Sequence, residues 1–135
     1  MRDHEGALQK GLIAWLKGDE ALQGLLGEPA RIWDEPPAQP GFPHLRVGAS
    51  QSRAVAAEGC GVEHTLTLHC VSRFGGSEEA RAICAAVRTR LEGAEIEADG
   101  VRTISLRATF ADVFRSGDLR RTYGVIRVRA VTEEI

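Results

Sequence analysis

Apolar residues at helical spacing predict three helices. Residues 5–17 form the first, and a second, shorter helix begins after Asp19, a residue suited to an N-cap, and ends at Gly27. A third follows Ser77, the expected N-cap, and ends at Gly93. The apolar positions that define the three helix faces are Leu8, Leu12, Trp15 and Leu16; Leu22, Leu25 and Leu26; and Ala80, Ile83, Cys84, Val87 and Leu91.

Alternation of apolar and polar positions predicts the strands. Residues 44–48 and 62–72 alternate, and the last third of the chain reads as a long hairpin that turns at 115–119. Within 62–72, Leu66, Leu68 and Cys70 face one way and Thr65, Thr67 and His69 the other. In the hairpin the even positions should face the core: Ile104, Leu106, Ala108, Phe110, Phe114, Ile126, Val128 and Ala130.

The connections differ in composition. All five prolines lie between residues 29 and 43, which predicts an extended loop at 35–43, preceded by a short edge strand at 31–33. Residues 51–61 have small side chains without a period, so we expect a long mobile connection that becomes ordered on assembly. The candidate assembly residues in it are Arg53, Val55, Glu58 and Cys60.

The element order α-α-β-loop-β-α-β-β predicts an α+β fold. Helices would cover one face of a mainly antiparallel sheet of about four strands that ends in a long C-terminal hairpin. A length of 135 residues, with 43% hydrophobic and 27% charged side chains, fits a single globular domain over residues 1–135.

Charge is unevenly distributed, although the net charge is only −2. Residues 101–131 contain seven arginines and two acids, and the odd-numbered face of the hairpin is polar and basic. Arginine suits planar contacts at interfaces. This face is therefore the candidate interface, with a solvated sheet face as the alternative: Arg107, Arg121, Tyr123, Arg127 and Arg129.

Catalytic and metal chemistry is not predicted. His64 and Cys70 should point to one face of a strand and His69 to the other, so they cannot share a metal ion, and surface histidines with a core cysteine are the simpler interpretation. Cys84 lies on a buried helical stripe, where a thiol is inert. The glycines before Ser77 lack the rest of a phosphate-binding loop. We expect no catalytic residues, metal or cofactor.

The chain has three cysteines, an odd number that does not suggest a disulfide framework. It shows no apolar leader and no run long enough to span a membrane. We therefore expect a protein of the reducing cytoplasm without membrane contact. We expect it to stay there until it is assembled into a larger particle.

The order of motifs is more specific than any one of them. In sequence these are Ala7, Leu8 and Leu12; Leu22, Leu25 and Leu26; Arg-Ile-Trp-Asp at 31–34; Pro-Gly-Phe-Pro-His-Leu-Arg-Val at 40–47; His-Thr-Leu-Thr-Leu-His-Cys at 64–70; Ser-Arg-Phe-Gly-Gly-Ser-Glu-Glu-Ala-Arg at 72–81; and Arg-Arg-Thr-Tyr-Gly-Val-Ile-Arg-Val-Arg-Ala at 120–130. This pattern resembles the tail terminator family of long-tailed phages and gene transfer agents, which includes members grouped as a domain of unknown function.

The resemblance implies a structural protein rather than an enzyme. It implies an α+β subunit of a homo-oligomeric ring, a hexamer in this family, which stops growth of the tail tube and meets the head-side connector. The implied partners are the subunit itself, the tail tube protein and the head-tail connector or stopper protein. DNA would pass through the channel without sequence-specific binding.

Other functions stay open at this point. One is a small-molecule or regulatory binding module, dimeric, that uses the sheet face around His69, Arg107 and Arg127. Another is a hydrolase or thiol enzyme that combines His64 or His69 with Cys60 or Cys70. Sequence-specific DNA reading is disfavoured, because no helix shows a basic recognition face.

Overall fold

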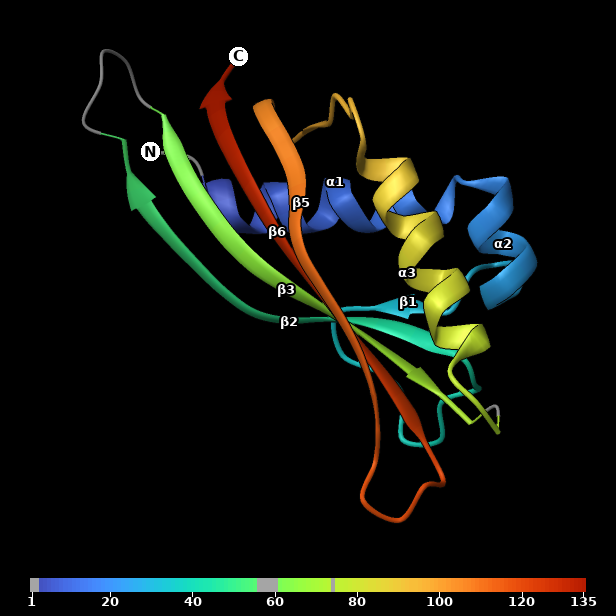
Figure 1. Cartoon of the computed structure of the whole chain (residues 1–135). Coiled ribbons are helices and arrows are strands. Elements are labelled where there is room, and N and C mark those ends of the chain that lie inside the picture. Colours follow the sequence, from blue (N-terminus) through green and yellow to red (C-terminus); the bar gives the residue numbers. More distant parts are fainter. Residues whose placement is uncertain (1–2, 56–60, 74) are drawn as a thin grey trace.

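A computed structural model describes residues 3–55, 61–73 and 75–135, in which three helices pack on one face of a mixed sheet (Figure 1). The helices are α1 (His4–Lys17), α2 (Glu20–Leu26) and α3 (Glu78–Leu91). Both chain ends lie at one end of the molecule, and the turn of the C-terminal hairpin projects from the opposite end (Figure 1). The predicted α+β class is confirmed.

The described residues form a sheet in the order β1-β2-β3-β6-β5-β4. Its strands are β1 (Ile32–Trp33), β2 (His44–Ala54), β3 (Val62–Ser72), β4 (Glu97–Ala98), β5 (Val101–Arg115) and β6 (Thr122–Glu134). Only the β1–β2 pair is parallel within it. The four long strands match the expected number, and the two-residue strands at the edges bring the total among the described residues to six. β4 is too short to show a periodicity from which it could be predicted.

Helix ends follow local chemistry. The Asp19 carboxylate accepts a hydrogen bond from the Leu22 amide at 3.1 Å, as expected of an N-cap. Ser77 does occupy the N-cap of α3, but its side chain makes no capping bond; its hydroxyl accepts instead from Nε of Arg81 at 3.0 Å. The expected capping interaction is therefore wrong, although the helix begins where the sequence predicts.

A single apolar core lies between the helices and the sheet. Its fully buried side chains include Leu12 and Leu16 from α1, and Leu68 from the middle of the sheet. The two long helices are also joined directly: the Trp15 indole donates to the Arg90 carbonyl, Nε of Arg90 donates to the Trp15 carbonyl, and both bonds measure 3.0 Å. Removing these apolar surfaces from water is the main stabilising contribution to the fold.

Two bulges in β5 change which hairpin side chains reach the core. The register against β6 shifts by one residue at Ile104 and again at Thr109. Each extra residue reverses the alternation that follows it. Beyond the second bulge Ala111 and Val113 pack on the core, whereas Phe110 and Phe114 are each 46% exposed. The expectation that even positions all face inward is confirmed for residues such as Leu106 and wrong for Ile104, Phe110 and Phe114.

Strand β2 is longer than the sequence predicts. Residues 51–54 continue it against β3, the Val55 amide donates to the Gly61 carbonyl at 3.0 Å, and strand structure resumes at Val62. The predicted long connection over 51–61 is therefore wrong for its first residues. This half of the strand is exposed, so it needs no apolar alternation. Residues 56–60, with Glu58 and Cys60, lie outside the described residues.

A pair of histidines joins the start of α1 to the sheet. The Thr132 hydroxyl lies 2.8 Å from Nδ1 of His4 and 2.8 Å from Nε2 of His64, so it can donate to one ring and accept from the other. His64 is only 1% exposed, which corrects the expectation of a surface histidine. Burial, reinforced by the neighbouring His4, lowers the pKa of His64 below its usual value of 6.5.

Gly124 is required where α3 crosses the sheet. A Cβ atom at this position of β6 would lie 2.7 Å from Sγ of Cys84 and 3.2 Å from Cβ of Cys70. Both cysteines are buried, so neither contact can be relieved by moving into solvent. The glycine lets α3 approach the sheet closely.

The pKa of His64 predicts acid sensitivity. Because the folded chain binds the proton less readily than the unfolded chain, protonation favours unfolding. We expect the free energy of unfolding to fall as the pH drops below 6.5, measured by urea denaturation between pH 8 and 5. His44 and His69 also have lowered pKa values, mainly from burial, and contribute to the same slope. His64→Gln should therefore reduce the dependence of the unfolding free energy on pH without abolishing it. An unchanged pH dependence would mean that His64 does not contribute to the acid sensitivity.

Gly124→Ala should destabilise the domain by about 1–3 kcal/mol, the usual cost of overpacking a core. Urea denaturation provides the measurement. The double variant Gly124→Ala/Cys84→Ala removes the sulfur atom that the new methyl group would meet, so its loss should be smaller than the sum of the two single losses. If the two single losses of stability simply add in the double variant, the contact with Cys84 of α3 does not cause the destabilisation by Gly124→Ala.

Candidate functional site

The face of the sheet that the helices leave uncovered contains the predicted interface residues. The pairing of β5, β6 and β3 places Arg107, Tyr123, Arg127 and Arg129 on this helix-free face, and Arg121 directly precedes β6. The strands thus bring the five candidates to one face. They form an elongated surface rather than one cluster.

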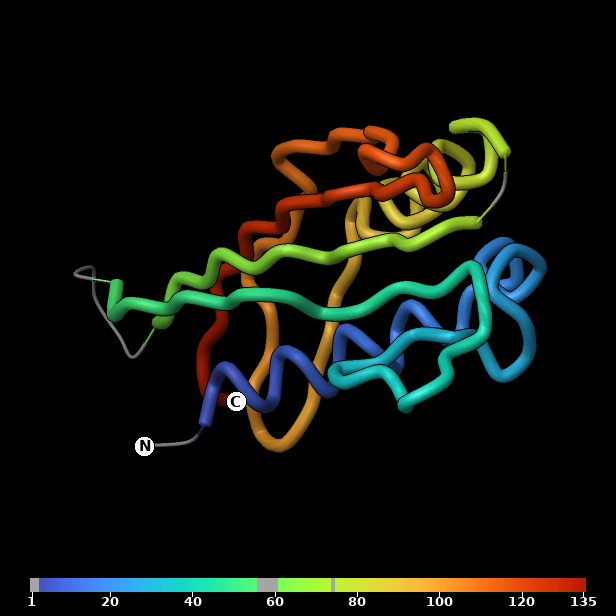
Figure 2. Tube along the Cα trace, turned by 90° about the horizontal axis from the view of Figure 1, so that it is seen from below, coloured from blue at the N-terminus to red at the C-terminus, as the bar shows by residue number. Residues whose placement is uncertain are grey.

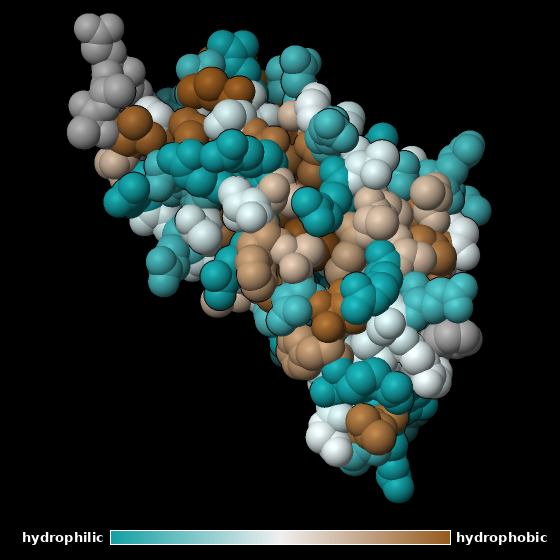
Figure 3. All heavy atoms as spheres, viewed as in Figure 1, coloured by the Kyte–Doolittle hydropathy of each residue, from teal (hydrophilic) through white to brown (hydrophobic). Residues whose placement is uncertain are grey.

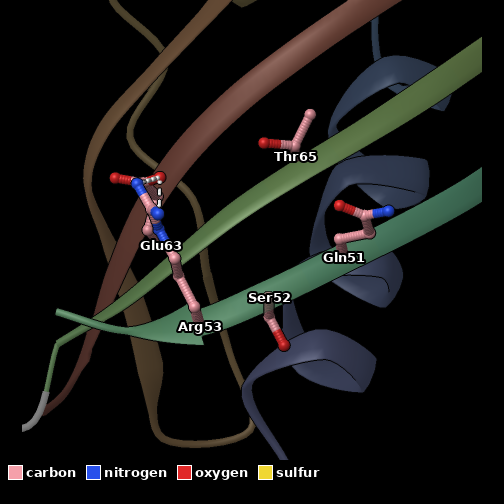
Figure 4. A pocket seen from close by; sticks show the side chains of 5 residues that line it. All are labelled: Gln51, Ser52, Arg53, Glu63 and Thr65. Atoms are coloured by element: carbon pink, nitrogen blue, oxygen red, sulfur yellow. Dashed lines mark hydrogen bonds and ion pairs between the residues drawn. The ribbon is translucent and has the colours of Figure 1, made fainter.

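A carboxylate binds two arginines at one end of the helix-free face. Glu63 lies 2.9 Å from a guanidinium nitrogen of Arg53 on β2 (Figure 4). A guanidinium nitrogen of Arg129 on β6 lies 2.6 Å from its other carboxylate oxygen. The hydrogen bond from Arg129 and the smaller effect of Arg53 hold the pKa of Glu63 below its usual value. Gln51 and Thr65 border the same shallow hollow (Figure 4). Arg129 is thereby positioned and partly neutralised.

Arg107 and Arg127 on the same face differ from Arg129 in their charge environment. Arg107 is directly opposite Arg129 on the neighbouring strand, and no carboxylate lies within ion-pair distance of Arg107 or Arg127 among the described residues. The Arg127 guanidinium lies 5.1 Å from the centre of the Phe110 ring, an arrangement that fixes the cation without neutralising it. Unpaired cations beside exposed aromatic rings are typical of interaction surfaces.

Exposed apolar residues are concentrated on the projecting hairpin. Phe110 and Phe114 are each 46% exposed, Leu119 at the turn is 63% exposed, and Ile104 on β5 is 58% exposed. Figure 3 shows hydrophobic atoms among hydrophilic ones along the course of β5 and at the hairpin tip. The Phe114 ring also contacts Tyr123, with 5.7 Å between centres. The alternation of the sequence predicts both phenylalanines in the core, because a bulge leaves no signal in it.

Both edges of the sheet are open over most of their length. β1 covers β2 only at Leu45 and Arg46, and β4 covers β5 only at Val101 and Arg102. Among the described residues, β2 beyond Val47 and β5 beyond Thr103 have no further strand beside them. Such edges present unpaired backbone donors and acceptors that another chain can bind. The edges lie on opposite sides of one sheet.

A basic hollow of about 670 Å³ lies where the proline-rich loop meets the sheet. It is bordered by residues of that loop and by Arg46, Arg73, Arg121 and Tyr123. Of these, the sequence predicts only Arg121 and Tyr123 as site residues. Arg46 lies near the start of β2, and Arg73 directly follows β3. Only the fold shows that both border the same hollow as the proline-rich loop.

The predicted assembly loop is only partly described. Arg53 is on β2 in the ion pair with Glu63, and the Val55 amide is bonded to Gly61. Glu58 and Cys60 are not among the described residues.

Buried thiols make the described cysteines unsuitable as nucleophiles. Cys70 is 0% and Cys84 5% exposed, and both are free. Burial raises the pKa of Cys70 to about 12 and also raises the pKa of Cys84. The predicted burial of Cys84 is confirmed. In the described part of the chain no three metal-ligating side chains gather, and no helix has the length and hydrophobicity of a membrane span.

The family model of the tail completion protein gp17 matches residues 10–133. The chain belongs to this family. It therefore has a structural role in the assembly of a tail, which confirms the predicted resemblance and function class.

A chain in the solved structure of the virion of a native gene transfer agent (GTA) particle has a similar fold. The TM-score is 0.87 at 24% sequence identity, and the match covers 98% of this chain and 99% of that chain. The comparison with curated proteins finds no match. The similarity extends across the whole tail completion fold, including the strands that form the open edges.

The burial of Cys70 and Cys84 predicts low thiol reactivity. In a Cys60→Ser variant, neither described thiol should react rapidly with a disulfide reagent such as DTNB at pH 8, because both are inaccessible and protonated. Both should react once urea unfolds the chain. Rapid labelling of the folded variant would contradict this account and would favour the thiol-enzyme alternative.

Proposed function

We propose that this member of the tail completion family is a tail terminator, a subunit of a closed homo-oligomeric ring that caps the tail tube and joins it to the head connector. The observation that most supports the ring is the pair of open edges on opposite sides of the sheet. A ring is built from two different surfaces on each subunit, one for each neighbour. The β2 and β5 edges supply such a pair.

The projecting hairpin supports contacts beyond the ring. Figure 2 shows the molecule from below, the side from which the β5–β6 hairpin projects in Figure 1. Its exposed Phe110 and Phe114 offer apolar area, and Arg107, Arg127 and Arg129 offer donors on the same helix-free face. We assign these residues to contacts with neighbouring subunits or with the tube. Arg53 and Val55 belong to the opposite end of the sheet, where the assembly loop begins.

The proposed role needs shape and complementary surfaces rather than catalysis, so we assign the chain no catalytic residues and no cofactor. Its partners would be further copies of itself, the tail tube protein and the head-side connector. The hexameric number follows from the resemblance to tail terminators, and DNA would pass through the centre of the ring.

The hairpin phenylalanines provide the sharpest test. Phe110→Glu/Phe114→Glu replaces exposed side chains, so the variant should stay folded, with a stability close to that of the wild type. We expect it to lose binding to polymerised tail tube protein, measured by cosedimentation and negative-stain imaging of the tube ends. The wild-type chain should be found at tube ends and should limit tube length.

A matched control places the same chemical change elsewhere. Ile135 is 67% exposed at the chain end opposite the hairpin turn, and Ile135→Glu should cap tubes normally. Normal capping by the hairpin variant would refute the role of the hairpin. If the wild-type chain forms a stable dimer and ignores tubes, the binding-module alternative is favoured instead.

A further inference from the structure

The basic hollow gathers three arginines, and Asp118 attracts Arg121 only from beyond ion-pair distance. Arg73 and Arg121 are exposed and Arg46 is half-buried. Among the described residues no carboxylate lies within ion-pair distance of any of the three, and none borders the hollow. Elsewhere on the same face the comparable Arg53 and Arg129 share Glu63. The hollow therefore concentrates unpaired guanidinium groups.

An aromatic ring holds two of these groups in place. The guanidinium carbon of Arg73 lies 4.0 Å from the centre of the Phe42 ring, and that of Arg121 lies 5.3 Å from it. Contact with a ring face leaves the N–H groups at the guanidinium edge free to donate. Phe42 thus positions the cations without using their hydrogen-bonding capacity.

The loop beside the hollow is anchored at its base. Nε of Arg31 donates to the Pro43 carbonyl at 2.8 Å, and its terminal nitrogen donates to the Phe42 carbonyl at 3.2 Å. The His44 ring bonds the Gly41 carbonyl at 3.0 Å. Prolines restrict the remaining backbone, so little conformational entropy would be lost on binding. The cavity is preformed.

The electrostatics of His44 agree with this description. His44 is 4% exposed and also borders the hollow. Burial is the main cause of its lowered pKa, and Arg46, Arg31 and Arg121 lower it further by repelling a second positive charge. A buried ring beside the hollow thus experiences the positive field of these groups.

We propose that the basic hollow binds an acidic peptide segment of a protein partner, with the carboxylates held by Arg73 and Arg121. The inference deepens the proposed function, since the hollow lies at the base of the projecting hairpin, where the ring would meet its axial partner. Guanidinium groups pair with carboxylates through two parallel hydrogen bonds. A hollow of about 670 Å³ suits a few peptide residues, whereas duplex DNA needs a long row of phosphate contacts.

The test measures binding on the purified chain itself. A fluorescein-labelled hexapeptide with four consecutive glutamates serves as the probe, followed by fluorescence anisotropy at low and at physiological salt. We expect binding to the wild type and at least a tenfold weaker affinity for Arg73→Glu/Arg121→Glu. The neutral variant Arg73→Gln/Arg121→Gln should also lose affinity, which separates loss of the donors from added repulsion.

The control makes the same change in net charge outside the hollow. Arg81 and Arg88 of α3 are both exposed, and neither borders the hollow. Arg81→Glu/Arg88→Glu should keep most of the affinity. Equal losses in the two glutamate variants would mean nonspecific attraction and would overturn the proposal.

Three further outcomes would also overturn it. One is failure of the wild type to bind the probe. Another is tighter binding of a 12-base-pair DNA duplex that depends on Arg73 and Arg121, which would favour a nucleic acid. The third is loss of self-association in the hollow variant, which would make the hollow an interface between copies. Peptide binding and ring formation are measured separately, so failure of one proposal is distinguishable from failure of the other.

Discussion

The register between β5 and β6 determines which side chains of the hairpin are buried and which are presented to partners. β5 contains two more residues than its partner can pair, at Ile104 and Thr109. The first shift turns Leu106 inward, and the second brings Ala111 and Val113 inward and Phe110 outward. Because a single extra residue reverses every later position, the second bulge undoes the first and returns Phe110 and Phe114 to the helix-free face, where they form its apolar part.

The residues that stabilise the fold lie on a different side of the sheet from the exposed residues available to partners. The helices, Leu68 and the other core residues stabilise one side of the sheet, and the packing of α3 at Gly124 leaves no room for variation there. The opposite side and both edges contribute little to the core. They combine exposed phenylalanines, unpaired arginines and open strands, which suit a structural subunit of the tail completion family.

Sequence patterns predict this fold well wherever a side chain faces the core. Helical spacing gives all three helices, and alternation gives β3 and β6 with the correct faces. Alternation fails at Phe110, because a bulge is a backbone event that residue spacing does not encode. It fails again at residues 51–54, because a strand beyond the core needs no apolar side. The common face of the candidate interface arginines is predictable from the alternation, whereas the position of Arg46 and Arg73 in the hollow depends on long-range pairing of strand ends.

The central claim is that copies of this chain join through two different surfaces into a closed ring. Size-exclusion chromatography with light scattering over a concentration series, followed by negative-stain imaging, tests it most directly, first on the chain alone and then on tail tubes. The account predicts closed rings with a mass of about six times 14.6 kDa, free in solution or at tube ends. A dimer closed through one self-complementary patch, or a chain that stays monomeric even with tubes, would contradict it.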